Sequence, residues 1–146
     1  MSLVDTCDAL YGGGAAEATR AAEALSTLAL DLRDVQQAMP ALAAALTRDE
    51  PGLLLAAAQA LHDVAAQGGQ AGLAFPALFA LRQHPHSALR RAVWDICAEL
   101  THTENQRLRA CLSLVRDDAA QALQDVDPVV RAAARRASDR LATLPR

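Results

Sequence analysis

Four histidines are the residues whose type most directly suggests metal chemistry, because imidazole is the commonest metal ligand in proteins. His84 and His86 flank Pro85, while His62 and His102 stand apart from the other histidines in the sequence. A metal site needs several ligands on elements that hold them at fixed distances, whereas a His-Pro-His segment is typical of a turn between helices. We therefore expect no metal site and no cofactor.

Motifs of known catalytic chemistry do not occur in the sequence. It contains neither Gly-x-Ser-x-Gly, which presents a nucleophilic serine, nor His-Glu-x-x-His, which binds zinc. The run Gly12 to Gly14 is not followed by Lys-Ser or Lys-Thr and no strand pattern precedes it, so it predicts a loop and not a phosphate cradle. We accordingly predict no catalytic residues and a protein that is not an enzyme.

Arginine supplies all fourteen basic side chains, and its planar guanidinium binds carboxylates and phosphates in a bidentate manner. Arginine without lysine, beside heavy alanine use, is also typical of a GC-rich, bacterial-type composition. The net charge of −3 is divided unevenly, because residues 1–73 carry −6 and residues 74–146 carry +3. A charge difference of this kind can orient a binding partner.

The three cysteines, Cys7, Cys97 and Cys111, form no CxxC pair, so the sequence predicts neither a zinc site nor a disulfide framework. Each lies at an apolar position of a helical pattern, where cysteine behaves as a small hydrophobe. No basic leader precedes an apolar run, and no apolar run is long enough to span a bilayer. We expect a cytoplasmic protein that does not bind a membrane.

The histidines, arginines and cysteines lie within a sequence that repeats about every 35 residues, so the repeated structure must position them. Residues 22–25 (Ala-Glu-Ala-Leu) return as residues 58–61 and, more loosely, as residues 93–96 and 134–137, at offsets of 36, 35 and 41. Self-similarity at such a period is typical of stacked helical pairs, each of which buries its apolar face against its neighbours. Alanine and leucine favour helix. The predicted fold class is all-α, a right-handed α-solenoid of about four antiparallel helix pairs without a sheet.

Local start and stop signals divide the chain into these pairs. Gly12 to Gly14 end a short first helix, and Asp127-Pro128 opens the last helix, with Asp as the cap and Pro at the first helical position. Thr103 and Gln106 have the spacing of a capping box. We predict a single domain, residues 1–146, with approximate helix pairs at 2–30, 31–67, 72–101 and 103–143.

Two sequence elements resemble the HEAT-repeat family. Segments 75–78 (Phe-Pro-Ala-Leu) and 81–85 (Leu-Arg-Gln-His-Pro) look like the first helix of the family's repeat and its turn, and segment 39–42 repeats the Pro-Ala-Leu element. Segment 127–134 (Asp-Pro-Val-Val-Arg-Ala-Ala-Ala) is similar to the start of the family's second helix. The similarity covers about 31–143 well and 2–30 weakly. The short first helix and an extra stretch, 117–124, depart from a regular array.

Side chains on one face of the second helices are the predicted binding site. Each recurring segment ends on a residue that we expect to be buried, at positions 25, 61, 96 and 137. The residue two positions before it lies about 200° around the helix from it. The HEAT resemblance implies that this face is concave. We predict that a polypeptide partner binds there with Trp94 as its anchor; the alternative is that Trp94 packs against an adjoining helix and the charged residues form a solvated face. The predicted partner-binding residues are Glu23, Gln59, Asp63, Arg90, Trp94, Arg131, Arg135 and Asp139.

The predicted function is a non-enzymatic protein-interaction module that acts as an adaptor, an assembly factor or an inhibitor of the immunity-protein type. HEAT-like proteins also include lyases and hydroxylases, some with a di-iron centre held by paired His-Glu motifs, so an accessory or catalytic role is an alternative, although no His-Glu dipeptide occurs. They include DNA-repair glycosylases as well, which makes nucleic-acid binding by the arginines a second alternative. The overall acidity and the single tryptophan count against it. The pattern specifies no oligomeric state.

Overall fold

The computed structural model describes residues 3–27, 36–66 and 71–145, and the regular structure in these residues is entirely helical. The predicted all-α class is therefore confirmed. The chain divides into two compact units, residues 1–80 and 81–146, and the boundary falls inside the third predicted helix pair. The predicted helix residues 28–35 and the predicted pair boundary at 67–70 lie outside the described residues.

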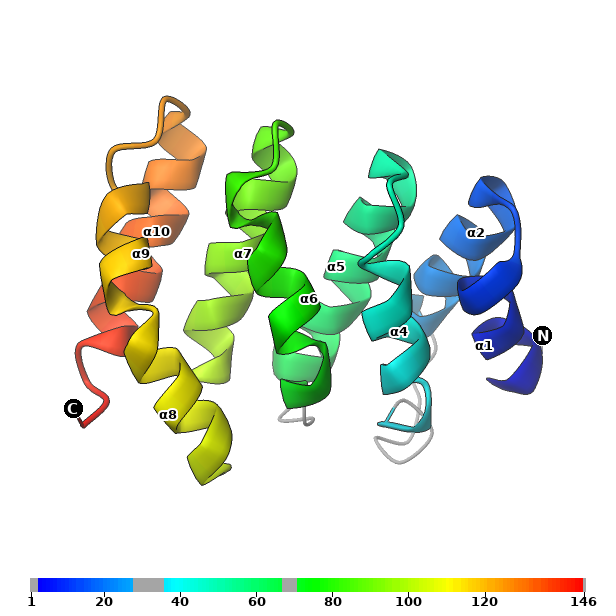
Figure 1. The fold of residues 1–146 in the computed structure, drawn as a ribbon, viewed down its shortest axis with the longest axis horizontal. Helices are drawn as coiled ribbons and strands as arrows, with labels where there is room; N and C mark the ends of the chain where they lie inside the picture. The colour runs from blue at the N-terminus through cyan, green and yellow to red at the C-terminus, as the bar shows by residue number, and fades with distance from the viewer. Residues whose placement is uncertain (1–2, 28–35, 67–70, 146) are drawn as a thin grey trace. The chain divides into compact units, whose positions relative to one another are not determined.

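The first unit consists of two layers of helices. The helices are α1 Leu3–Gly12, α2 Ala15–Thr27, α4 Met39–Ala45, α5 Pro51–Ala66 and α6 Phe75–Phe79, and a 3₁₀ turn, Gly72–Ala74, precedes α6. Helix α2 packs along α5 in one layer, while α1 packs on α4 and α4 on α6 in the other (Figure 1). Contacts of α1 with α2 and of α4 with α5 join the layers.

The buried sides of α2 and α5, which pack on each other, are rich in small side chains. Ala18, Ala21 and Ala22 of α2 are buried, as are Ala57 and Ala58 of α5. Alanine projects only a methyl group, so the two helices can approach closely. The repeated segments 22–25 and 58–61 thus belong to two helices that pack side by side.

The turn after α1 requires a glycine and is held by a distant arginine. The N–H of Gly13 donates to the carbonyl of Ala9 at 2.9 Å, and a Cβ on Gly13 would lie only 2.7 Å from that oxygen. Arg48, which follows α4, donates from Nη2 to the Gly13 carbonyl at 2.8 Å and to Glu50 Oε1 at 2.7 Å. The predicted end of the first helix is confirmed, and Arg48 ties it to α4.

The second unit places α10 between α7 and α9. Its helices are α7 Ser87–Leu100, α8 Gln106–Leu114, α9 Arg116–Ala122 and α10 Pro128–Leu141, and a 3₁₀ turn, Ala80–Gln83, lies at the boundary between the units. Helix α10 packs along α7 and on α9, and α8 leads into α9 at Val115 (Figure 1). The extra stretch 117–124 of the sequence therefore forms most of α9 and the two residues after it.

Two helix starts in this unit test the predicted caps. Asp127 accepts a hydrogen bond from the N–H of Val129 at 2.8 Å, so the predicted Asp-Pro start of α10 is confirmed. The capping box at Thr103 is wrong, because α8 begins at Gln106 and the side chain of Asn105 accepts from the backbone of Arg107 at 3.0 Å. Asparagine is among the strongest N-cap residues, and here it lies closer to the apolar run than the threonine does.

The three cysteines lie in different environments. Cys97 is fully buried in α7, and burial raises the pKa of its thiol to about 12. Cys7 is half-buried, and burial together with the neighbouring Asp8 carboxylate raises its pKa. Cys111 is exposed on α8, so the prediction that it occupies an apolar, inward position is wrong.

Replacement of Gly13 by alanine should lower the free energy of unfolding by about 1–3 kcal/mol, because the new methyl group would collide with the Ala9 carbonyl. Gly12→Ala is the matched control, since a Cβ at Gly12 meets no atom within 4 Å. Urea denaturation followed by circular dichroism measures both variants. Equal stabilities would contradict the role given to Gly13.

Candidate functional site

Helix α10 divides into a buried and a charged side. Val130, Ala133, Ala134, Ala137 and Leu141 are buried. The other side carries a group that we call the α10 arginine face. Its members are Arg131, Arg135, Arg136, Asp139 and Arg140.

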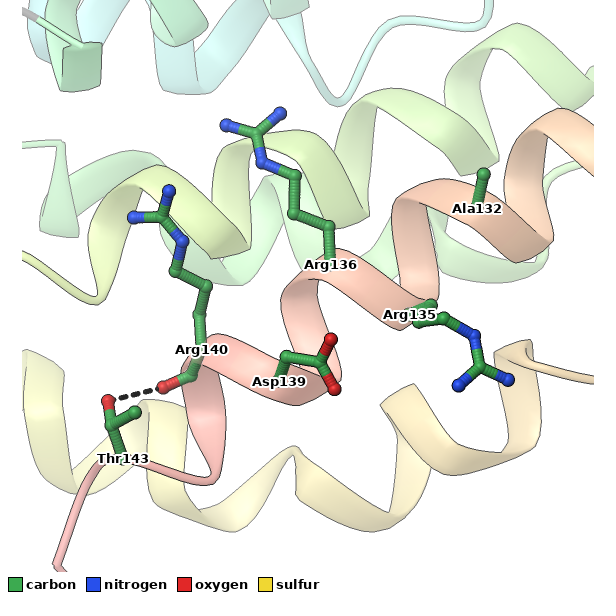
Figure 2. A pocket seen from close by; sticks show the side chains of 6 residues that line it. All are labelled: Ala132, Arg135, Arg136, Asp139, Arg140 and Thr143. Atoms are coloured by element: carbon green, nitrogen blue, oxygen red, sulfur yellow. Dashed lines mark hydrogen bonds between the residues drawn. The ribbon is translucent and has the colours of Figure 1, made fainter.

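An open hollow of about 460 Å³ lies on the α10 arginine face. Figure 2 shows Arg136 and Arg140 extending to one side of the hollow and Arg135 to the other, with Asp139 between them along the helix. The remaining lining residues are small, Ala132 and Thr143. A short acidic segment that entered the hollow would therefore meet the arginines and no large apolar side chain.

Two of these arginines contact the preceding helix pair. Arg136 Nη2 lies 2.6 Å from Glu99 Oε1, and Arg140 contacts the ring of His102. Arg131 donates to the carbonyls of Asp125 at 2.7 Å and Val126 at 3.2 Å, so it braces the loop before α10.

Arg135 differs from its neighbours. It is exposed, and within residues 3–27, 36–66 and 71–145 it has no carboxylate within ion-pair distance. Asp139, four residues further along α10, forms no ion pair with Arg135 in the described residues. Both side chains are at the surface, where such a pair contributes only about 0.3–0.5 kcal/mol. The guanidinium of Arg135 is consequently available to a ligand.

Arg90 belongs to an internal clasp. Its Nε and Nη2 donate to the two carboxylate oxygens of Asp125 at 2.9 and 3.1 Å, and its Nη1 donates to the carbonyls of His84 at 2.9 Å and Pro85 at 3.0 Å. Each side chain of the pair is 14 % exposed. Arg90 thus ties α7 and the turn before it to the loop before α10, and it is not free for a partner.

The clasp shifts the pKa of both of its charged groups. The hydrogen bonds from Arg90 are the main cause that lowers the pKa of Asp125, with a further contribution from the backbone N–H of Asp127, and the same pair raises the pKa of Arg90. At Asp127, the N–H of Val129 chiefly lowers the pKa. Each of these carboxylates is therefore held in its charged form.

Trp94 is not an exposed anchor, and this correction removes the centre of the predicted site. Its side chain is 1 % exposed, and it lines a small hollow in the second unit with Arg82, Arg90 and Asp118 among others. The prediction assumed one apolar stripe on α7. In fact α7 buries Leu89, Val93 and Ile96 on one side and Trp94 and Ala98 on another, so its buried arc is wider than a single stripe.

The three predicted residues of the first unit keep surface positions. Glu23 is exposed on α2 and lines a hollow with Asp49 and Pro51. Gln59 is exposed on α5 and donates to Asp63 Oδ1 at 3.0 Å, one turn further along. The structure thus brings Gln59 and Asp63 into contact, whereas Arg135 and Asp139 line the same hollow on α10 without forming an ion pair.

The histidines have structural contacts. His84 Nδ1 accepts the backbone N–H of His86 at 3.0 Å and so stabilises the predicted turn between helices, while His62 Nδ1 lies 4.0 Å from Asp63 Oδ1. Within the described part of the chain, no three His, Cys, Asp or Glu side chains are grouped so that they could hold a metal ion. Among the described helices, none is long and apolar enough to cross a membrane.

Sequence reasoning missed the partners of the arginines, although the repeat contained a signal for them. The contacts Arg48–Gly13, Arg90–Asp125, Arg136–Glu99 and Arg140–His102 span 35, 35, 37 and 38 residues. Each separation is close to one repeat. A search for opposite polar groups one period apart would have pointed to these pairs.

Comparison with known proteins adds information on the fold alone. No protein-family model matches the chain, and no curated protein sequence matches it. A crystal structure of an engineered protein is similar over 99 % of this chain, with a TM-score of 0.80 and 18 % sequence identity. The chain spans 64 % of the length of that protein. The likeness supports the all-helical fold and carries no information on activity.

Trp94→Ala should lower the free energy of unfolding by about 3–5 kcal/mol, because it removes a large buried side chain and leaves a cavity. Arg91→Ala is the control, since Arg91 is exposed on the same helix. Guanidinium denaturation followed by circular dichroism gives both values. A change below about 1 kcal/mol for Trp94→Ala would show that the side chain is not part of a packed core.

Asp125→Asn should remove part of the acid sensitivity of the protein. A carboxylate whose pKa is lowered in the folded state contributes stability above its unfolded pKa of about 3.9 and loses it as the pH falls through that value towards the folded one. We expect the variant to be less stable at neutral pH and to lose less stability between about pH 5 and about pH 3. The exposed Asp117 provides the control, Asp117→Asn. If the free energy of unfolding falls equally with pH in wild type and in Asp125→Asn, then Asp125 is not a source of the acid sensitivity.

Proposed function

We propose that the protein is a non-enzymatic interaction module of the HEAT-like α-solenoid type, acts in the cytoplasm and binds a polypeptide through the α10 arginine face. The partner carries carboxylates at the contact. An adaptor, an assembly factor and an inhibitor of the immunity-protein type would each use such a surface. Arg135 replaces Trp94 as the central residue of the proposed site.

The observation that carries the proposal is the state of Arg135. Its guanidinium is exposed at the edge of a hollow and has no acidic neighbour within ion-pair distance in the described residues. Arginine binds carboxylates in a bidentate manner and is enriched at the energetic centres of protein interfaces. Its neighbours Arg136 and Arg140 already have contacts of their own, so they are positioned before a partner arrives.

The solenoid part of the proposal is supported by the arrangement inside each unit. In the first unit, helices 36 residues apart in the repeat, α2 and α5, pack side by side. In the second unit, α7 and α10 do the same. Polar contacts that span about one repeat tie successive pairs together in both units.

The experiment starts with capture of partners from an extract of the native cell, treated with nuclease, on immobilised wild-type protein. Arg135→Glu should weaken the binding of a captured protein by roughly tenfold or more, because a carboxylate would then face the acidic surface of the partner. Association should also become slower and less sensitive to salt, since attraction between opposite charges increases encounter rates.

Arg20→Glu is the matched control, because it makes the same charge change at an exposed position of α2. Surface plasmon resonance at several salt concentrations compares the three proteins. Equal rates for wild type and Arg135→Glu would rule out the α10 arginine face as the binding site. Loss of affinity for duplex DNA, with no captured protein affected, would favour the nucleic-acid alternative.

A further inference from the structure

Helix α1 has an exposed stripe that mixes apolar and acidic residues. Val4 and Tyr11 are 68 % and 56 % exposed, and the exposed Asp8 lies between them at helical spacing. The opposite side of α1, with Ala9 and Leu10, is buried. The large apolar side chains of the stripe are therefore outside the core of the first unit.

Helix α8 has a similar stripe of opposite charge. Leu114 is 81 % exposed, and Cys111 and Arg107 are exposed at the positions one and two turns before it. Leu108 and Leu112 are buried on the other side of α8. Each stripe therefore contains a charged residue within a surface formed by apolar or weakly polar side chains.

The charges of the two helices select between possible pairings. Helix α1 contains two aspartates and no basic residue, whereas α8 contains two arginines and no acidic residue. Contact between two α1 helices or between two α8 helices would place like charges together, which is unfavourable. Contact between α1 and α8 would place opposite charges together and cover the apolar residues of both stripes.

We propose that copies of the chain associate head to tail, with the α8 stripe of one copy on the α1 stripe of the next. The two stripes lie in different units of the chain. Such a contact uses two different surfaces, so it leaves one stripe free at each end and allows chains of several copies to form. The α10 arginine face takes no part in it, and the inference does not depend on the function proposed above.

Charge reversal at both stripes tests this association in the full-length protein. Sedimentation velocity over a wide range of concentrations should show a mass that rises with concentration for the wild type. Asp8→Arg and Arg107→Asp should each weaken association by roughly tenfold or more, because each places like charges in the contact. The double variant, Asp8→Arg with Arg107→Asp, should restore association, because the two charges are then exchanged.

Two further variants separate this contact from general effects. Leu114→Ser should weaken association without changing any charge, and Arg20→Asp should leave it unchanged although it makes the same charge change as Arg107→Asp. A wild type that stays monomeric throughout would overturn the proposal. So would a double variant that stays monomeric while both single variants remain folded by circular dichroism, or a dimer that depends on only one of the two stripes.

Discussion

Close packing of α2 against α5 and of α7 against α10 is the constraint on which the other features depend. Alanine dominates the buried side of α2 and of α10, so each contact buries little area per residue and many contacts are needed. Long arginine side chains complement this packing, because their aliphatic stems reach across a helix pair while their guanidinium groups bind polar atoms. Arg90 joins α7 to the loop before α10 in this way, and Arg48 joins α4 to the end of α1.

Local chemistry explains why much of the fold could be predicted from the sequence. The cap at Asp127 and the end of α1 at the glycine run depend on residues within a few positions, so their signals are readable in the sequence. The burial of Trp94 depends on which helices surround α7, and one helical pattern cannot specify that. Asn105 shows a related limit, since it and Thr103, two positions earlier, are both good N-cap residues, and the helix begins after the one closer to the apolar run. Of the candidate site, the repeat predicted the helix α10, whereas the partners of its arginines emerge only when polar groups one repeat apart are compared.

The arginines of α10 illustrate how one residue type can stabilise a fold and, in the function proposed above, also bind a partner. Arg131 and Arg136 hold carbonyl or carboxylate groups of the chain itself, and these contacts restrict their rotamers. Arg135 is exposed and has no ion-pair partner among the described residues, so its donors would be open to another molecule. A surface organised in this way would lose little side-chain entropy on binding a partner, because most of it is already ordered in the free protein.

The buried thiol of Cys97 makes α7 a natural reporter of opening motions. With a pKa of about 12, almost no thiolate is present at neutral pH, and the surrounding side chains keep reagents away. Cys111 on α8 is open to the same reagents. Alkylation of Cys111 and of Cys97 should therefore proceed at widely different rates, and the slow reaction of Cys97 would report how often α7 separates from α10.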